Sequence, residues 1–169
     1  METRVLGAED AERVRVLRLD ALRDSPTAFS SSEEEERDIP VAQVAERLAP
    51  TPDGAVFGAF EDGALVGMAG LHRERHRKLA HKGVLWGVYV KPAFRRRGLA
   101  RRLLEEALRY AASMPGLRQV NLGANAASPA ALALYEALGF ERFGFERGFM
   151  AIDGVLYDEV HMTRLVTKR

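Results

Sequence analysis

Apolar and polar positions along the chain recur with two different periods, which together predict an order of elements. A spacing of three and four residues predicts helices, and short apolar runs between turn residues predict strands. The predicted helices are Glu9 to Asp24, Pro40 to Leu48, Gly98 up to Met114, and Ala130 to Leu138; the predicted strands are Thr3 to Leu6, Ala55 to Phe60, Ala64 to Leu71, Val84 to Val90, Val120 to Ala124, Glu141 to Phe149 and Val155 to Val166. The predicted order is β-α-α-β-β-β-α-β-α-β-β.

Turn residues and proline define the segments between these elements. Asp62-Gly63 and Asp153-Gly154 each separate two apolar runs, which predicts two hairpins. Ser25 to Arg37 contains serine, proline and four consecutive glutamates, Glu33 to Glu36, so we expect a mobile loop with a solvated acidic face. Val84 to Val90 is apolar and runs into Lys91-Pro92, which predicts a strand buried on both faces.

Composition narrows the class of protein. The 169 residues are 47% apolar, enough for one domain spanning residues 1–169. Lys and Arg number 25 against 24 Asp and Glu, so no global charge would attract nucleic acid or an anionic membrane. Cysteine is absent, and no apolar run reaches the length of a signal peptide or of a membrane span. We therefore expect a cytoplasmic protein with no membrane partner and no specific nucleic-acid partner.

The strand Val84 to Val90, the loop Pro92 to Arg97 and the helix that begins at Gly98 predict an anion site. The first N–H groups of a helix lack intrahelical partners and lie at the positive end of its dipole, so a phosphate can accept several of them. Gly98 permits a close approach of the backbone, and Ala100 keeps the path clear. The surrounding charge comes from Arg95, Arg96, Arg97, Arg101 and Arg102. The alternative is a solvated arginine run before an ordinary helix.

Two motifs resemble those of one enzyme family. Arg95-x-x-Gly98-x-Ala100, after Val88-Tyr89-Val90-x-Pro92, is similar to the coenzyme signature of the GNAT superfamily of N-acetyltransferases. Leu134 to Phe140 resembles that family's Leu-Tyr-Glu-x-x-Gly-Phe segment. The resemblance implies a GNAT fold of the α/β (α+β) class: a mixed, mostly antiparallel central sheet of about seven strands, flanked by about four helices and splayed at the coenzyme strand.

The resemblance also implies a reaction and its residues. Acetyl-CoA would be the co-substrate, no metal would take part, and the product would be an N-acetylated amine. The pyrophosphate would lie on the backbone of Arg95, Arg96, Arg97, Gly98, Leu99, Ala100 and Arg101, and the pantetheine along Val88, Tyr89 and Val90. The Val90 N–H would polarise the thioester carbonyl, and Tyr135 would donate a proton to the departing thiolate. Ser128 stands where the family often has asparagine.

The group that removes the amine's proton is left open. Many relatives have a glutamate on the coenzyme strand, whereas Lys82 to Val90 contains no carboxylate. The candidates are His72, Glu74, Asp158, Glu159 or a chain of water molecules.

The amine acceptor is expected to be a small molecule or a peptide. In the family it lies between the segments that correspond to Asp24–Arg37 and Phe145–Tyr157, where Phe29, Phe145, Phe149 and Tyr157 would form an apolar wall. Dimerisation is common in the family, so the resemblance allows a homodimer, although no residue pattern in the sequence indicates one.

Three other functions are compatible with parts of the sequence. A CoA-binding regulatory domain without activity would fit the absence of a strand glutamate but not the presence of Tyr135. A basic nucleic-acid-binding module would use the connector His72 to Lys82 with the arginine run, yet the connector lacks aromatic residues for base stacking. The spacing of His72, His76 and His81 suggests a metal, but neighbouring arginines would repel a cation.

Overall fold

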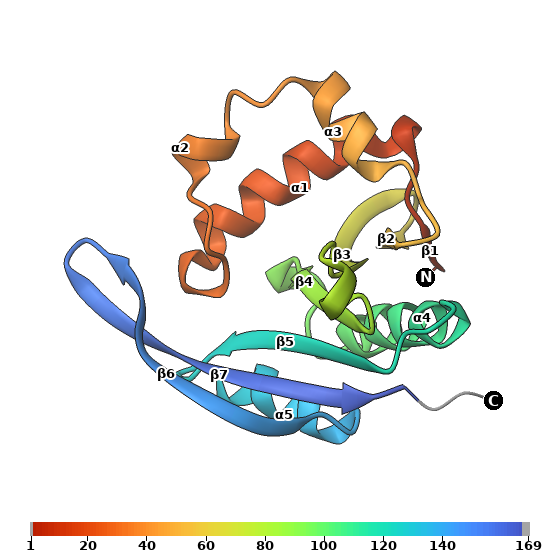
Figure 1. Cartoon of the computed structure of the whole chain (residues 1–169). Coiled ribbons are helices and arrows are strands. Elements are labelled where there is room, and N and C mark those ends of the chain that lie inside the picture. The colour runs from red at the N-terminus through yellow and green to blue at the C-terminus, as the bar shows by residue number, and fades with distance from the viewer. Residues whose placement is uncertain (1, 167–169) are drawn as a thin grey trace.

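The computed structural model describes residues 2–166 and contains five α-helices around one sheet (Figure 1). The helices are α1 (Ala11–Asp24), α2 (Glu33–Glu36), α3 (Val41–Leu48), α4 (Leu99–Ser113) and α5 (Pro129–Ala137), with the 3-10 turns η1 (Ala8–Asp10), η2 (Pro26–Ala28), η3 (Arg77–Leu79) and η4 (Pro92–Phe94). The strands are β1 (Glu2–Val5), β2 (Gly54–Glu61), β3 (Ala64–Arg73), β4 (Lys82–Val90), β5 (Gln119–Asn125), β6 (Glu141–Ile152) and β7 (Val155–Leu165). The predicted order of strands and longer helices is confirmed.

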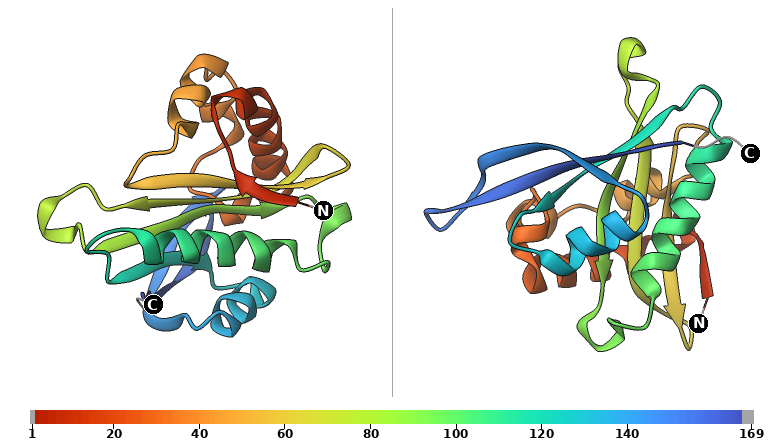
Figure 2. Two further views of the ribbon diagram at one scale, coloured as in Figure 1. Left: turned by 90° about the vertical axis from the view of Figure 1, so that its right-hand side faces the viewer. Right: turned by 90° about the horizontal axis from the view of Figure 1, so that it is seen from below.

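The seven strands form one sheet in the order β1-β2-β3-β4-β5-β7-β6. Only β4 and β5 run parallel, and every other neighbouring pair is antiparallel. We call the side of the sheet that carries α1 and α3 the α1 face, and the side that carries α4 and α5 the α4 face (Figures 1 and 2). The mixed, mostly antiparallel sheet between two layers of helices is the fold class that the sequence predicted.

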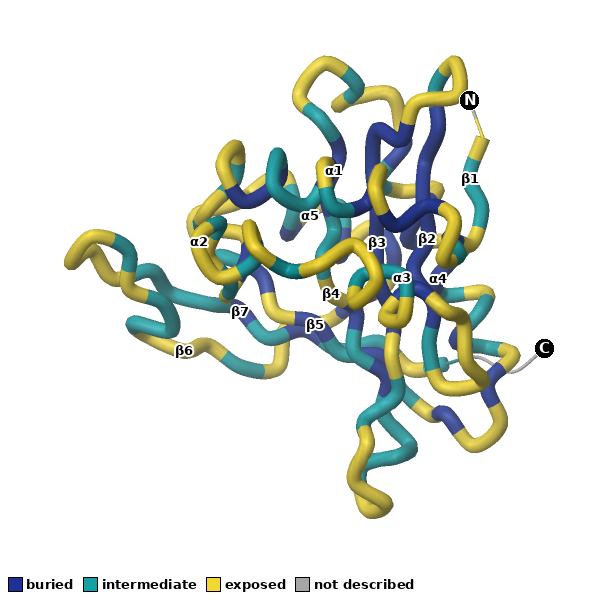
Figure 3. The backbone as a smooth tube through the Cα atoms, turned by 90° about the horizontal axis from the view of Figure 1, so that it is seen from above, coloured by how far each residue is buried: buried dark blue, intermediate teal, exposed yellow. Residues whose placement is uncertain are grey.

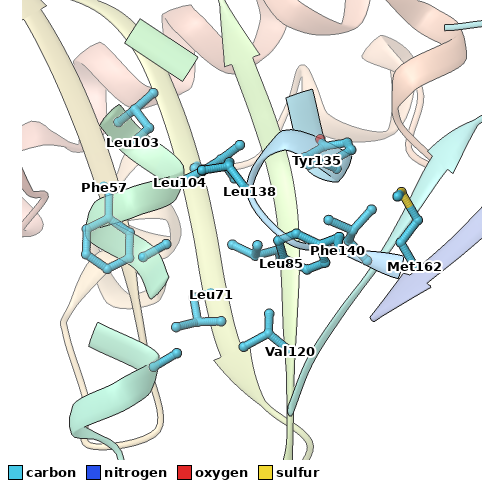
Figure 4. Close-up of a cluster of buried hydrophobic side chains, with 14 of the residues drawn as sticks. Phe57, Leu71, Leu85, Leu103, Leu104, Val120, Tyr135, Leu138, Phe140 and Met162 are labelled. Atoms are coloured by element: carbon cyan, nitrogen blue, oxygen red, sulfur yellow. The ribbon is translucent and has the colours of Figure 1, made fainter. Parts of the chain in front are cut away.

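Each face of the sheet has its own apolar core. On the α4 face, Leu103 and Leu104 of α4 pack with Leu71 and Leu85 of the strands (Figure 4). On the α1 face, Leu17 and Leu22 belong to a second cluster with Leu6, Phe29, Met68 and Tyr89. The helical spacing of leucines in α1 and α4 produces these two stripes, because residues three and four apart share one side of a helix. Each fully buried leucine contributes about 1.5–3 kcal/mol.

The sheet opens between its two parallel strands. β4 and β5 pair at only three positions, and the last is Val84 opposite Asn121. After Val84 no further residues of the two strands pair, so the rest of β4 is separated from β5 by an opening. Gly87 has a φ of +63° and lies in a bulge where β4 has one residue more than β3 between Trp86 and Tyr89. The splay expected at the coenzyme strand is therefore present.

The expectation that β4 is buried on both faces is wrong. Trp86 is 38% exposed, so the strand is not buried on both faces. The strand's neighbours explain the difference: β5 turns away beyond Val84, and α1 and α3 leave a cavity above Trp86. An apolar run indicates a buried environment, but it does not show which side chains a splayed neighbour leaves uncovered.

The acidic run also differs from the prediction. Glu33–Glu36 is a turn of helix, α2, with a capping box in which Ser32 and Glu35 exchange hydrogen bonds of 3.2 and 2.7 Å. Glu36 faces inward and binds Arg18 of α1 with two hydrogen bonds of 2.8 Å. The expectation of a solvated acidic face was wrong for Glu36, because a distant arginine compensates its charge.

The β6–β7 hairpin extends beyond the rest of the sheet (Figure 2), and most of its residues are exposed or intermediate (Figure 3). Glu146 is followed by a wide bulge in β6, where Gly148 adopts a φ of +60° and donates a hydrogen bond of 2.8 Å to Asp158 of β7. None of the helices within residues 2–166 is both long and apolar enough to cross a bilayer.

Candidate active site

The loop between β4 and α4 has the backbone of an anion site. Arg96 and Gly98 adopt left-handed φ values of +62° and +79°. The Arg102 N–H donates to the Gly98 carbonyl at 3.1 Å, so the N–H groups of Leu99, Ala100 and Arg101 precede the first helical hydrogen bond. A Cβ built at Gly98 would meet no atom within 4 Å, which leaves the approach to these N–H groups open. The local conformation therefore fits the predicted phosphate cradle.

The arginines of this loop do not all play the part that the sequence predicted. Arg95 is directed back to β4: its Nε donates to the Val90 carbonyl at 2.9 Å, and its other end binds the Asp24 carboxylate of α1. The Arg95 guanidinium also lies 5.6 Å from the centre of the Tyr89 ring. Arg95 thus ties the loop to the end of the strand, and the contact with Asp24 carried no sequence signal.

The remaining charges surround the start of α4. Arg97 lies 3.9 Å from Glu61, and Arg101 lies 3.6 Å from Glu105, one turn further along α4. Both side chains are about half exposed, so these ion pairs are weak. Arg96 is exposed as well. A polyanion could therefore displace these partners at little cost.

At Val90, the edge of β4 that faces the opening carries a backbone N–H and a carbonyl that do not pair with β3. The Lys91 N–H donates to the Val66 carbonyl at 2.9 Å, so Lys91 bonds toward β3. Groups of successive residues in an antiparallel pair point to alternate sides, and the N–H and carbonyl of Val90 therefore point away from β3. The carbonyl is held by Arg95, and the N–H is directed into the opening. Val88 is only partly buried, next to the Gly87 bulge.

Tyr135 lies in α5, on the α4 face. It is 8% exposed, and its ring packs edge-on against Phe140 with the centroids 6.0 Å apart (Figure 4). Its hydroxyl makes no hydrogen bond within residues 2–166. Burial raises the pKa of the Tyr135 phenol to about 12. The phenol is therefore protonated throughout the neutral range and can act as a proton donor.

Ser128 and Asn125 occupy the end of β5 and the start of α5. The Ser128 N–H donates to the Asn125 carbonyl at 3.0 Å, and the Ser128 side chain is exposed. The Asn125 side chain accepts from the Ala127 N–H at 2.7 Å and donates to the Thr27 carbonyl at 3.2 Å. Asn125 therefore connects β5 to the segment after α1, a role that the sequence analysis did not assign to it.

The four candidate bases lie in different places. His72 pairs with Val84, where β4 and β5 are still joined, and desolvation lowers the pKa of its imidazole. Glu74 follows β3 and is further from the opening. Asp158 accepts the Gly148 N–H and holds the β6 bulge. Glu159 lies on β7, beside β5, with only 15% of its side chain exposed.

A cavity of about 290 Å³ lies on the α1 face, between α1, α3 and the strands. Its wall includes Met68 and Trp86, and its polar part comprises the ion pair Arg18–Glu36 with Arg15, Ser31 and Arg47. Burial alone would raise the pKa of Glu36, but the hydrogen bonds and charge of Arg18 hold that pKa below its usual range. A Cβ at Gly87 would lie 3.8 Å from Arg18 Nη1, so this pair reaches the bulge of β4.

The apolar wall expected from four aromatic residues is only partly formed. Phe29 is 6% exposed and packs against Tyr89 at 6.4 Å, with the Arg18 guanidinium 4.7 Å from its ring centre. Phe145 is 58% exposed, while Phe149 packs edge-on against His161 at 6.3 Å. Phe29 is therefore a core residue, because the segment after α1 folds back onto the sheet.

Among residues 2–166, no three histidine, cysteine or acidic side chains come together as metal ligands.

Comparison with known proteins identifies the family. The sequence model of the Acetyltransferase (GNAT) family matches residues 18–140, more than half of the chain, so this protein belongs to the GNAT acetyltransferases. The chain is 36% identical over 108 residues to the N-alpha-acetyltransferase RimI of Mycobacterium tuberculosis. The match covers 64% of this chain and 65% of that relative, just under two-thirds of its length.

Solved structures share the fold over the whole chain. An acetyltransferase of the GNAT family from Streptococcus pneumoniae has a TM-score of 0.86 at 22% identity and covers 98% of this chain and 99% of its own. A GNAT phosphinothricin acetyltransferase from Sinorhizobium meliloti, in complex with acetyl-CoA, has a TM-score of 0.82 at 24% identity and covers 98% and 88%. The recognition of the family from two motifs is thereby confirmed.

Proposed function

We propose that this protein is an acetyl-CoA-dependent N-acetyltransferase that acts on a primary amine of a small molecule or a peptide. The observation that carries the proposal is the opening between β4 and β5 after Val84, with the cradle Arg95–Arg101 at the end of β4. Membership of the GNAT family and the RimI relative support it.

The residues present fit acetyl-CoA, which supplies an acetyl group bound as a thioester. The open space at Gly98 and the N–H groups of Leu99, Ala100 and Arg101 suit a pyrophosphate. The outward edge of Val88 to Val90 offers backbone groups to an extended pantetheine. The Val90 N–H, which points into the opening, would polarise the carbonyl, and Tyr135 would hold the proton that the departing sulfur requires.

The amine would approach from the α1 face. The cavity with Arg18, Glu36 and Trp86 lies on that face next to the β4 bulge. Its largely apolar wall would hold the part of the acceptor beyond the amine, and the Arg18–Glu36 pair would contribute polar contacts. The substrate class therefore includes amines with an apolar or mixed side chain, such as a peptide N-terminus.

An assay of thiol release from acetyl-CoA tests the proposal. The acceptors are spermidine, free amino acids, an aminoglycoside, an alanine-initiated peptide and the same peptide with its N-terminus blocked. Amine-dependent thiol release, with loss of activity on the blocked peptide, would establish acetyl transfer to an amine. A thermal shift with CoA but no thiol release from any acceptor would instead indicate a binding domain without activity.

A further inference from the structure

The acceptor amine must lose a proton, and β4 offers no carboxylate to accept it. An alkylammonium has a pKa near ~10 and cannot act as a nucleophile while it is protonated. On the α4 face, the strands next to the opening present Val120, Leu122 and Ala124 of β5 with Val160 and Met162 of β7. Side chains alternate along a strand, so Gly123 of β5 and Glu159 of β7 lie on the α1 face. This is the face from which the amine would approach.

The carboxyl group of Glu159 lies over Gly123. A Cβ built at Gly123 would be 2.0 Å from Glu159 Oε1, 2.6 Å from its carboxyl carbon and 3.2 Å from Oε2. Gly123 is exposed and lies two residues beyond Asn121, the last β5 residue paired with β4. Because Gly123 has no side chain, a carboxylate from β7 reaches the part of β5 that borders the opening.

The surroundings of Glu159 suit a proton acceptor. Burial raises the pKa of its carboxyl group, the nearby His161 opposes that rise, and Glu146 adds to it. His161 Nδ1 lies 3.6 Å from Glu159, and His161 Nε2 lies 3.1 Å from Glu146 of β6. The 3-10 turn η2, which packs on β5, carries no charged side chain. His161 and Glu146 are thus the charged groups that the structure places around Glu159.

We propose that Glu159 is the general base of this enzyme and that His161 positions it. This inference rests on the proposed function. The Glu159 carboxylate takes one proton from the ammonium group, and the freed nitrogen lone pair forms the bond to the acetyl carbon. The nitrogen releases its second proton to solvent, which leaves a neutral amide. The bond between the acetyl carbon and sulfur breaks, its electron pair stays on sulfur, and Tyr135 gives sulfur a proton. The Tyr135 phenolate then regains a proton from solvent, and Glu159 releases the proton that it took.

The geometry separates Glu159 from the other candidates. His72 pairs with Val84 and Glu74 bonds to Lys82, so both lie where β4 and β5 are still joined, and Asp158 is held by the Gly148 N–H. Among the four candidates, Glu159 is the one whose carboxyl group borders the opening and is not engaged in a hydrogen bond that stabilises the backbone. Within residues 2–166, no backbone N–H donates a hydrogen bond to the Glu159 carboxylate.

The first experiment replaces Glu159 by glutamine and measures acetyl transfer to spermidine and to an alanine-initiated peptide across a pH series. At neutral pH, kcat/KM should fall by about 100-fold or more. Below the pKa of the amine, log(kcat/KM) of E159Q should rise by one per pH unit, because only the unprotonated amine then reacts. Glu141→Gln, on an exposed position of β6, is the matched control and should retain the wild-type rate and profile.

A rescue experiment tests the location of the carboxylate. Glu159→Ala should lose activity, and the double variant Glu159→Ala with Gly123→Asp should be at least tenfold more active than Glu159→Ala. A Cβ at Gly123 would lie 2.0 Å from the position of Glu159 Oε1, so the aspartate carboxyl group, one bond further, would lie beside the place that the glutamate carboxyl group occupies. Gly123 has no positive φ, so aspartate causes no backbone strain. Failure of the rescue in a folded double variant with normal CoA affinity would contradict the location.

A third readout does not depend on turnover. Carbon-13 NMR of the Glu159 carboxyl group, in protein without acetyl-CoA, should give the same pKa as the acidic limb of the wild-type kcat/KM profile. A different value would assign that limb to another group and overturn the proposal. If the wild type acetylates an amine and E159Q does so equally fast, Glu159 is not the base while the acetyltransferase stands. If the wild type acetylates none, both proposals fall.

Discussion

Arg95 holds Val90 by the carbonyl: its Nε donates to the Val90 oxygen at 2.9 Å. The first residue of the cradle is thereby fixed to the last residue of the coenzyme strand. The same guanidinium also binds Asp24 of α1, so Arg95 connects the loop after β4 to both β4 and α1. In the proposed enzyme, Arg95 would therefore act on coenzyme binding through position, whereas Arg101 would act through charge.

Arg95→Ala should weaken CoA binding by about tenfold and lower the free energy of unfolding by about 1–3 kcal/mol, because Asp24 and the Val90 carbonyl lose a charged partner. Arg101→Ala should weaken CoA binding without loss of stability, and its effect should diminish as salt rises. Calorimetric titration with CoA at two salt concentrations, together with urea unfolding, distinguishes the two. Equal salt dependence in both variants would contradict a positioning role for Arg95.

Gly98→Glu should abolish measurable CoA binding, because it places a negative side chain where phosphate must approach. Gly98→Ala is the control for the backbone, since both variants bear the strain of a φ of +79°, which costs about 1–2 kcal/mol. The alanine variant should bind CoA with a modest loss, as no atom lies within 4 Å of the new Cβ. Thermal-shift titration reports both effects, and unchanged affinity in the glutamate variant would refute the cradle.

Tyr135→Phe should leave CoA affinity intact and lower kcat by about 100-fold, because the proton donor is lost. With the pKa of the phenol raised to about 12, Tyr135 should cause no fall in wild-type activity on the alkaline side below pH ~10. Tyr110→Phe is the control: it loses a hydrogen bond of 2.6 Å to the Thr51 carbonyl and should retain activity. If Tyr135→Phe turned over at the wild-type rate, Tyr135 would be a core residue only.

Asp10 should make the fold sensitive to acid. It is 1% exposed and accepts two hydrogen bonds from Arg4, at 2.7 and 2.8 Å, and one from the Gly7 N–H. Arg4 thereby lowers the pKa of Asp10 below its unfolded value, despite the opposing effect of burial. The stabilisation is thus complete above the unfolded pKa, near ~3.9, and is lost as the pH falls through the folded pKa.

Asp10→Asn should therefore lower the free energy of unfolding at pH 7 by about 1.5–3 kcal/mol and flatten its decline in acid. Glu12→Gln, at an exposed position of α1, should change neither. Urea unfolding between pH 2 and pH 7 measures both quantities, and a decline as steep in Asp10→Asn as in the wild type would assign the acid sensitivity to other groups.

Trp86 is the sole tryptophan of the chain and lines the cavity on the α1 face. Binding of an amine acceptor there should change its fluorescence in the presence of CoA. The titration can be repeated with Arg18→Ala, which removes one charged group of the cavity wall and leaves Glu36 without its ion-pair partner. A fluorescence change that saturates with the same midpoint in both proteins would place the acceptor elsewhere.

The sequence alone was enough to predict the fold class, which the structure confirms, and to propose the residues of a coenzyme site. The cradle is a local unit, because a strand, a loop and a helix start within consecutive residues bring Val90, Arg95 and Gly98 together. Tyr135 follows from a contiguous motif for the same reason. Helical and strand periods reflect burial on one side of an element, so the element order could also be read from them.

The residues proposed for the acceptor side could be brought together only by the tertiary structure, because they meet when segments distant in sequence pack. Glu159 reaches Gly123 because β7 pairs with β5 and Gly123 has no side chain to exclude it. Glu36 is only partly exposed because α2 folds onto α1 and Glu36 pairs with Arg18, although the run of four glutamates predicts a solvated surface. Residues that are close in sequence can be recognised as a site from the sequence alone. Contacts across a sheet depend on strand order and register, which local patterns do not specify.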